Sequence, residues 1–310
     1  MPTRRRRVLG WVMIATGLLV ALAAILLVVA WHRLVQVDFQ PSAQDSRADT
    51  TFLVLGSDVT DGITEAIADE LGREEEPGTA RADIIMLVRV AADGAATAVS
   101  VPRDLLVLDD DGDPQRLAML YTDGASTLAR GVCRGLDVGV DHVVVANAQA
   151  VVDVVDALGG LDVDIPVALR DERSHIDLPA GRQTIDGMET LGLIRSRDTQ
   201  YLVDGRWVPV GPAEGALHRA SAALEVLGEL RTQAARAPLT ATAAAAWAGL
   251  PQVTIDEGLG PVDLVRLGAD FPAGEVLATD PVGEDDSGMT LADGAADRLV
   301  ELGFGPCRTS

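Results

Sequence analysis

The chain has 310 residues, a formal net charge of −22 and a pI near 4.4. All 25 basic residues are arginine. A strongly acidic chain lacks the basic face that non-specific nucleic-acid binding needs, which excludes nucleic acid as a partner. The length is enough for one large domain with its own core.

The N-terminal region has the pattern of a membrane anchor followed by a spacer. Residues 8–30 are uncharged and long enough, as a helix, to cross the roughly 30 Å of a bilayer core, and Arg4–Arg7 precede them. Since positively charged flanks stay inside, we predict a cytoplasmic tail over residues 1–7 and a transmembrane helix over 8–30. A polar stalk follows over residues 31–50. A cleaved signal peptide is the alternative interpretation of the apolar segment.

The remaining residues, 51–310, are predicted to form one domain outside the cytoplasm, with a β-hairpin at its centre. Residues 84–90 and 95–101 are apolar, β-branched runs of strand length. Asp83 precedes the first strand and Arg103 follows the second. Antiparallel pairing therefore predicts that this carboxylate and this guanidinium lie at the same end of the sheet.

A second carboxylate is expected close to the hairpin end. The predicted strand at residues 51–55 runs into a polar turn that contains Asp58. Two carboxylates at strand ends suit Mg²⁺, which often takes one or two protein carboxylates together with substrate phosphates. Asp58 and Asp83 are thus candidate metal ligands.

Strands and helices alternate over the rest of the chain, which predicts an α/β or layered α-β-α domain. Loops are expected at residues 59–80 and 199–213. The predicted helices are at 126–134, 148–158, 187–194, 214–233, 240–248, 261–271 and 291–302, and the further strands at 141–146, 161–167 and 275–278.

The cysteines and the acidic run at residues 109–113 allow limited conclusions. Cys133 and Cys307 either pair in an oxidising compartment or remain two buried thiols. The four histidines show no ligand spacing, so a zinc site is not expected. The acidic run lacks the spacing and closing glutamate of a calcium loop, which favours a simple turn.

Arginines add a second kind of ligand group. Arg103, and Arg195 with Arg197 after the helix at 187–194, offer permanently charged forks that bind phosphate oxygens bidentately. An Arg-x-Arg pair is also common on ordinary surfaces. On an anchored, outward-facing domain that also carries acids, the combination favours a membrane-bound pyrophosphate as substrate.

Six short motifs in order resemble the LytR-CpsA-Psr (LCP) family of cell-wall glycopolymer ligases. They span about residues 51–220 and comprise Leu55-Gly-Ser-Asp58, Arg81-Ala-Asp83-Ile-Ile-Met86, Ser100-Val-Pro-Arg-Asp104, Gly139-Val-Asp-His142, Val154-Val-Asp-Ala-Leu-Gly-Gly-Leu161, and Ile185-Asp-Gly187 with Ile194-Arg-Ser-Arg197.

The resemblance implies a single extracytoplasmic α-β-α domain with a mixed central sheet and an apolar tunnel for a polyprenyl tail. It also implies transfer of a glycopolymer from a polyprenyl-pyrophosphate carrier to a peptidoglycan hydroxyl, with release of polyprenyl phosphate. By the matching motifs, Asp58 and Asp83 would hold Mg²⁺, and either might assist deprotonation of the acceptor. The pyrophosphate would be clamped by four arginines, namely Arg103, Arg195, Arg197 and Arg219. Asp104, Asp141 and His142 also fall in these motifs but are interpreted as structural.

Two departures from the family pattern leave other functions open. Ala118 replaces an expected amide, and Ala216 replaces the first arginine of a later motif, where Arg206 is a possible substitute. A weakened arginine cluster would fit a non-catalytic module that binds polyprenyl-linked glycan or cell wall. A polyprenyl pyrophosphatase, with water as acceptor, is the remaining alternative.

Overall fold

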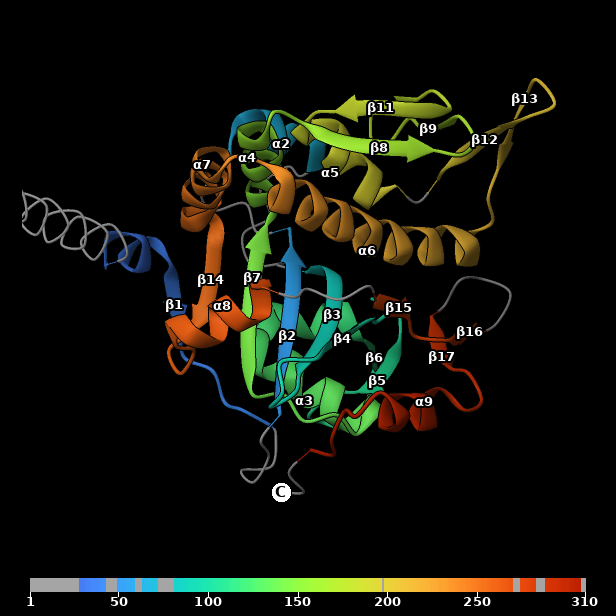
Figure 1. Cartoon of the computed structure of the whole chain (residues 1–310). Helices are drawn as coiled ribbons and strands as arrows, with labels where there is room; N and C mark the ends of the chain where they lie inside the picture. The colour runs from blue at the N-terminus through green and yellow to red at the C-terminus, as the bar shows by residue number, and fades with distance from the viewer. Residues whose placement is uncertain are drawn as a thin grey trace, which may run out of the picture.

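The computed structural model describes residues 28–42, 49–58, 63–71, 81–196, 198–269, 274–282 and 288–307. Its centre is a mixed seven-stranded sheet in the order β1-β14-β7-β2-β3-β4-β15 (Figure 1). β2 pairs parallel with β7 and antiparallel with β3, which confirms the predicted mixed sheet. The strands are β1 (Val35–Val37), β14 (Val253–Asp256), β7 (His142–Asn147), β2 (Thr50–Ser57), β3 (Ala82–Val90), β4 (Ala96–Ser100) and β15 (Gly274–Val276).

Alternating side chains of the central strands fill a core on each face of the sheet. Leu53 and Leu87 pack in one cluster with Leu128 of α3 (Ala125–Leu136). Phe52 packs on the opposite face, in a cluster that includes Leu267 of α8 (Pro261–Ala269). Helices therefore cover both faces of the sheet, as the alternation of elements predicts.

A second layer lies across one end of the central strands (Figure 1). Its own apolar core joins small sheets to the long helix α6, which runs between this layer and the central sheet. The small sheets are β8 (Leu161–Ile165) with β11 (Gly181–Ile185), and β10 (Ile176–Leu178), β9 (Leu169–Asp171), β12 (Gln200–Val203) and β13 (Arg206–Pro209). The helices here are α2 (Glu65–Leu71), α4 (Ala148–Leu158), α5 (Gly187–Arg195), α6 (Pro212–Arg236) and α7 (Leu239–Gly249).

The remaining elements are short. The acidic run at residues 109–113 is a turn between β5 (Leu106–Leu108) and β6 (Pro114–Arg116), as predicted. The 3₁₀ helices are η1 (Leu117–Asp123) and η2 (Leu250–Gln252). β16 (Thr279–Pro281), β17 (Met289–Leu291) and α9 (Ala295–Glu301) complete the C-terminal region.

Four sequence predictions were wrong in part. The predicted loop at 199–213 contains the β12–β13 hairpin, closed by Asp204-Gly205 with positive φ at both residues, the geometry of a tight hairpin turn. The loop at 59–80 contains α2. Part of the predicted stalk is β1, which joins the sheet edge because Val35–Val37 pairs in parallel with β14. The helix expected at 291–302 is shorter, since β17 occupies its start.

The predicted tail at residues 1–7 lies outside the described residues, as does the transmembrane helix at 8–30 apart from residues 28–30. Among the helices that the structure describes, none combines the length and apolar character needed to cross a membrane.

The two cysteines were predicted either to form a disulfide or to remain buried thiols, and in the structure they form the disulfide. Cys133 in α3 is bonded to Cys307 near the C-terminus. The bond ties the end of the chain to a helix that covers the central sheet.

Candidate functional site

The site is organised by a β-bulge at Asp83. Along the β2–β3 pair, Gly56 is opposite Ile84 and Ser57 is opposite Ala82, so Asp83 is an extra residue without a partner. A bulge of this kind re-aims the side chain of the extra residue. The Asp83 carboxylate, 22% exposed, is thereby directed to the end of the hairpin.

Gly56 permits the close approach of the two strands beside the bulge. A Cβ atom at this position would lie 2.9 Å from Cδ1 and 3.0 Å from Cβ of Ile84. Any larger residue would push Ile84 away, and with it the neighbouring Asp83.

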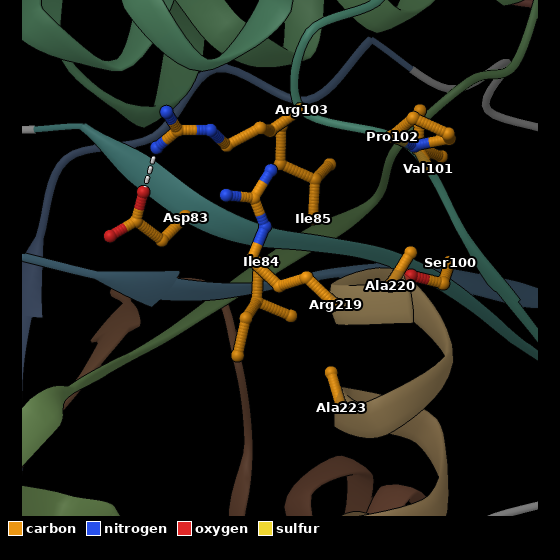
Figure 2. Close-up of a pocket in the computed structure, with 10 residues that line it drawn as sticks. All are labelled: Asp83, Ile84, Ile85, Ser100, Val101, Pro102, Arg103, Arg219, Ala220 and Ala223. Atoms are coloured by element: carbon orange, nitrogen blue, oxygen red, sulfur yellow. Dashed lines mark hydrogen bonds and ion pairs between the residues drawn. The ribbon is translucent and has the colours of Figure 1, made fainter. Parts of the chain in front are cut away.

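Arg103 reaches Asp83 from the next strand end. β4 ends at Ser100, and the chain passes through Pro102 into a turn from which the Arg103 Nη1 atom donates to the Asp83 carboxylate. Figure 2 shows this ion pair, with the Arg219 side chain rising from α6 toward it. The hairpin prediction that placed these charges at the same end of the sheet is confirmed.

Asp104 holds the arginines together. Its carboxylate accepts a hydrogen bond from Nη2 of Arg219 at 3.3 Å, and its Oδ1 atom lies 3.6 Å from Nε of Arg103. Nη1 of Arg116 lies 3.7 Å from the same oxygen. Asp104 is 9% exposed and Arg219 is 5% exposed, so this charge pairing is shielded from water.

The cluster keeps spare capacity for an anion. Three arginines (Arg103, Arg116 and Arg219) lie around two carboxylates (Asp83 and Asp104). Within the described part of the chain, the buried Nε atom of Arg103 makes no hydrogen bond. Buried donors are normally satisfied, so this one is suited to an oxygen of a bound group.

Asp58 lies at the adjacent strand end. Its Oδ1 atom accepts from the Arg81 amide at 2.7 Å, and its own amide donates to the Arg81 carbonyl at 3.2 Å. These bonds fix Asp58 beside the start of β3. Burial raises the pKa of Tyr121, and the negative charge of Asp58 raises it further. A hydrogen bond with Ser57 lowers this pKa but does not outweigh the other two effects, so the phenol stays protonated beside Asp58.

The donor set fits Mg²⁺ only as an ion shared with a ligand. Among the described residues there is no group of three or more acidic, histidine or cysteine side chains that could hold a metal. Asp58 and Asp83 lie at neighbouring strand ends and would be the residues to hold such an ion, since Mg²⁺ takes one or two carboxylates when phosphates complete its shell.

The other predicted arginines differ in position. Arg195 is half-buried at the last residue of α5 and does not line the pocket around Arg103, while Arg197 lies outside the described residues. Arg206, the possible substitute for the missing charge, is exposed on the β12–β13 hairpin and does not line the pocket. Arg219 is the α6 residue that the structure brings to Arg103.

Asp141 and His142 have structural contacts, as predicted. Oδ2 of Asp141 accepts from the Thr51 amide at 2.7 Å. Nδ1 of His142 lies 3.1 Å from Asp256, and its ring packs on Phe52 with centroids 5.7 Å apart. Asp141 thus connects the start of β7 to β2, and His142 connects β7 to β14.

Two hollows flank α6. The pocket at Asp83 and Arg103 is narrow, about 10 Å³, with walls that include Ile84, Ala220 and Ala223. A groove of about 1200 Å³ lies on another side of α6, against β8 and β11. Its lining mixes apolar residues such as Val226 with charged ones, and it does not include Arg103. The mixed lining of this groove differs from the apolar tunnel that the family resemblance implies.

Sequence reasoning missed two members of the cluster. Asp104 was expected to have a structural role only, and Arg116 was not among the candidate site residues. The available signal was chemical: Arg116 is a permanently charged side chain two residues before Ala118. Ala118, which stands where the family pattern has a side-chain amide, is buried. Its backbone N–H donates to the Arg103 carbonyl at 3.0 Å.

These features define a mixed α/β protein with an arginine-rich pocket at the strand ends, chemically suited to a phosphorylated ligand. Residues 30–206 match the model of the LytR_cpsA_psr family. The chain belongs to the LytR-CpsA-Psr family.

Known relatives agree with this membership. The chain is 30% identical over 190 residues to the probable cell wall biosynthesis protein LcpB of Corynebacterium glutamicum, covering 60% of this chain and 46% of LcpB. It is 31% identical over 183 residues to the cell wall biosynthesis protein LcpA of the same organism, covering 48% and 35%. The chain thus spans less than half the length of these relatives.

Solved structures share the fold. A LytR-Csp2A-Psr enzyme from Actinomyces oris superposes with a TM-score of 0.73 at 28% identity, over 90% of this chain and 99% of that one. TagT bound to LIIa-WTA superposes with a TM-score of 0.58 at 19% identity, over 86% and 98%. At that identity, the second likeness concerns the fold alone.

Proposed function

We propose that this protein transfers a glycopolymer from a polyprenyl-pyrophosphate carrier to a hydroxyl of peptidoglycan. The hydroxyl oxygen attacks the phosphorus next to the glycan, and the bond to the bridging oxygen breaks. The glycan is then joined through a phosphodiester, and polyprenyl phosphate leaves. Family membership supports this reaction, as do cell-wall biosynthesis relatives and a fold shared with TagT, one structure of which is bound to LIIa-WTA.

The observation that carries the proposal is the convergence of Asp83, Arg103 and Arg219 in one pocket from three separate elements. Phosphoryl transfer needs little from the protein beyond positioning and charge stabilisation. Arginine forks that are already held in place by Asp104 can stabilise the diphosphate without reorganising.

Asp58 and Asp83 are proposed to hold Mg²⁺ together with the diphosphate. The ion, when bound, supplies further neutralisation of the phosphate oxygens. One of the two aspartates accepts the proton of the acceptor hydroxyl, because both are carboxylates at the strand ends where the phosphates are proposed to bind.

The arginine cluster favours an enzyme over a binding-only module. Arg116 contacts Asp104 and so adds a third arginine to the cluster. The apolar pocket walls, among them Ile84 and Val101, are proposed as the start of the path for the polyprenyl tail. The uncharged segment at residues 8–30 is proposed to anchor the protein with its domain outside the membrane.

The test uses the full chain in detergent with Mg²⁺, a polyprenyl-pyrophosphate glycan and peptidoglycan oligomers. Wild type should release polyprenyl phosphate and label the oligomers. Arg103→Ala and Asp83→Ala should each lower the rate by about 100-fold or more, the usual cost of losing one charge-stabilising group. Arg130→Ala is the matched control, because Arg130 pairs with Asp110 on the exposed surface.

Other outcomes would contradict the transferase. Release of polyprenyl phosphate together with glycan phosphate, without labelled oligomers, would indicate a pyrophosphatase. Binding of the donor without turnover by wild type would indicate a non-catalytic module.

A further inference from the structure

Apolar side chains gather where the chain enters the domain. Val28 and Val29, on the helical turn before β1, are 57% and 41% exposed, and Val35 of β1 is 49% exposed. α8 exposes Val262 and Val265 at 63% and 69%. Isolated exposed valines are ordinary, but grouped apolar residues often mark an interaction surface.

α8 and the entering chain belong to the same part of the fold. Leu264 and Leu267, on the inner side of α8, pack in the cluster that also contains Leu34 and Trp31. The exposed side of α8 carries Val262 and Val265 as well. A surface helix normally turns polar residues outward, so an apolar outer side needs a partner.

A tryptophan on α7 is fixed to the entering chain. Nη1 of Arg33 donates to the Trp247 carbonyl at 2.9 Å, and the guanidinium carbon lies 4.6 Å from the centre of the Trp247 ring. Trp247 is still 39% exposed. Figure 1 shows β1, α7 and α8 toward the same edge of the central sheet. Tryptophan beside arginine is typical of a membrane–water interface.

The exposed charges on this surface are positive, although the protein as a whole has a net charge of −22. Among the exposed side chains described on α8, the charged one is Arg266. Asp263 is half-buried, accepts from the Gly260 amide at 3.3 Å and lies 3.8 Å from Arg266. An anionic bilayer would repel most of this acidic protein, but it would attract Arg33 and Arg266.

We propose that the surface formed by residues 28–35, Trp247 and the outer side of α8, here called the α8 face, rests on the lipid bilayer. The occupant follows from the chain itself, because the uncharged segment at residues 8–30 ends at this surface. The inference rests on the proposed membrane anchor. It adds that the domain is held against the membrane in one orientation rather than swinging on a free stalk.

The test places a fluorescent bimane on Val265→Cys in the full chain, reconstituted in vesicles of phosphatidylethanolamine and phosphatidylglycerol with brominated acyl chains. Val208→Cys is the matched control, since Val208 is an apolar side chain, 46% exposed, on the β12–β13 hairpin. The native cysteines are paired and do not react. Quenching by the brominated lipid should be several-fold stronger at position 265 than at position 208.

A second pair of variants checks the cause. Val262→Asp with Val265→Asp should keep the protein in the vesicles but reduce lipid quenching of a label on Val35→Cys. Val203→Asp with Val208→Asp, the same change on the exposed hairpin, should leave that quenching unchanged.

Each remaining outcome overturns the inference. Equal quenching at positions 265 and 208 in protein that floats with the vesicles would show a domain free of the bilayer. A label at 265 that is shielded from aqueous iodide but not quenched by lipid would indicate a second copy of the chain on the α8 face. Protein that does not float would remove the anchor and the inference together, whereas the detergent assay of transfer would be unaffected.

Discussion

Asp104 is the residue on which the arrangement of the pocket depends. It contacts three arginines while exposing 9% of its surface. An anion that binds several cations keeps them in place before the substrate arrives. Its importance for activity is therefore expected to exceed that of an ordinary surface acid, although it touches no substrate in the proposed reaction.

Replacing Asp104 by Asn should lower kcat/KM for transfer by about 10- to 100-fold, because small misplacements of binding groups have effects of this size. It should also lower the free energy of unfolding by about 1–3 kcal/mol, since the buried Arg219 loses its charged partner. The measurements are transfer kinetics and urea unfolding. Asp110→Asn, which loses surface ion pairs to Arg130 and Arg134, should leave activity unchanged.

The pair of His142 and Asp256 predicts a pH dependence of stability. Burial lowers the pKa of His142, but the hydrogen bond from the ring to Asp256 and nearby negative charges outweigh it, so the pKa is raised above 6.5. A raised folded pKa gives stability that is complete below pH 6.5 and is lost as the pH rises through the folded value.

The expected result is a free energy of unfolding that falls as the pH rises above 6.5. Urea titrations between about pH 5 and pH 9 measure it, the range around the ordinary pKa of histidine. His142→Gln should remove this slope. If the variant keeps the wild-type dependence of unfolding free energy on pH, a group other than His142 titrates in this range.

At the scale of elements, the β2–β3 bulge links backbone packing to the position of Asp83. Gly56→Ala should cost about 1–3 kcal/mol, the usual price of overpacking, because its new methyl would lie 2.9 Å from Ile84. Transfer should fall with it, since Ile84 is the neighbour of Asp83. Gly228→Ala on α6 is the control: a Cβ there meets nothing within 4 Å. Thermal unfolding and transfer rates would show whether the two variants differ as expected.

Local signals made several elements predictable. The helix predicted at 148–158 has the same bounds as α4, because Asn147 caps it through the Ala150 amide and Gly159 ends it in the left-handed conformation. The hairpin around Asp83 and Arg103 followed from two apolar runs and a turn. The β12–β13 hairpin also carried a local signal, the Asp204-Gly205 turn, which was overlooked.

Distant contacts were harder to predict. β1 is three residues long and is a strand because Val35 lies opposite Thr254, a relation that no local pattern reveals. Arg219 was expected from the family motif and not from helix periodicity. The contacts of Asp104 with Arg116 and Arg219 join three elements, so their geometry appears only once the chain is folded.

At the scale of the whole molecule, one covalent bond closes most of the domain. Cys133 and Cys307 are 174 residues apart in sequence, and a crosslink over so long a loop strongly restricts the unfolded chain. Cys133→Ser with Cys307→Ser should therefore lower stability by about 2–5 kcal/mol. Melting temperatures with and without dithiothreitol test this. Reductant should bring wild type to the value of the double variant and leave the variant unchanged.

The position of β14 in the sheet also affects the order in which the strands can pair during synthesis. β14 separates β1 from β7, yet it is synthesised long after both. A nascent chain must therefore carry an open β7 edge until residues 253–256 have emerged, and non-local pairing of this kind is slow. Pulse-labelled chains should consequently gain protease resistance late, after residues 253–256 have left the ribosome.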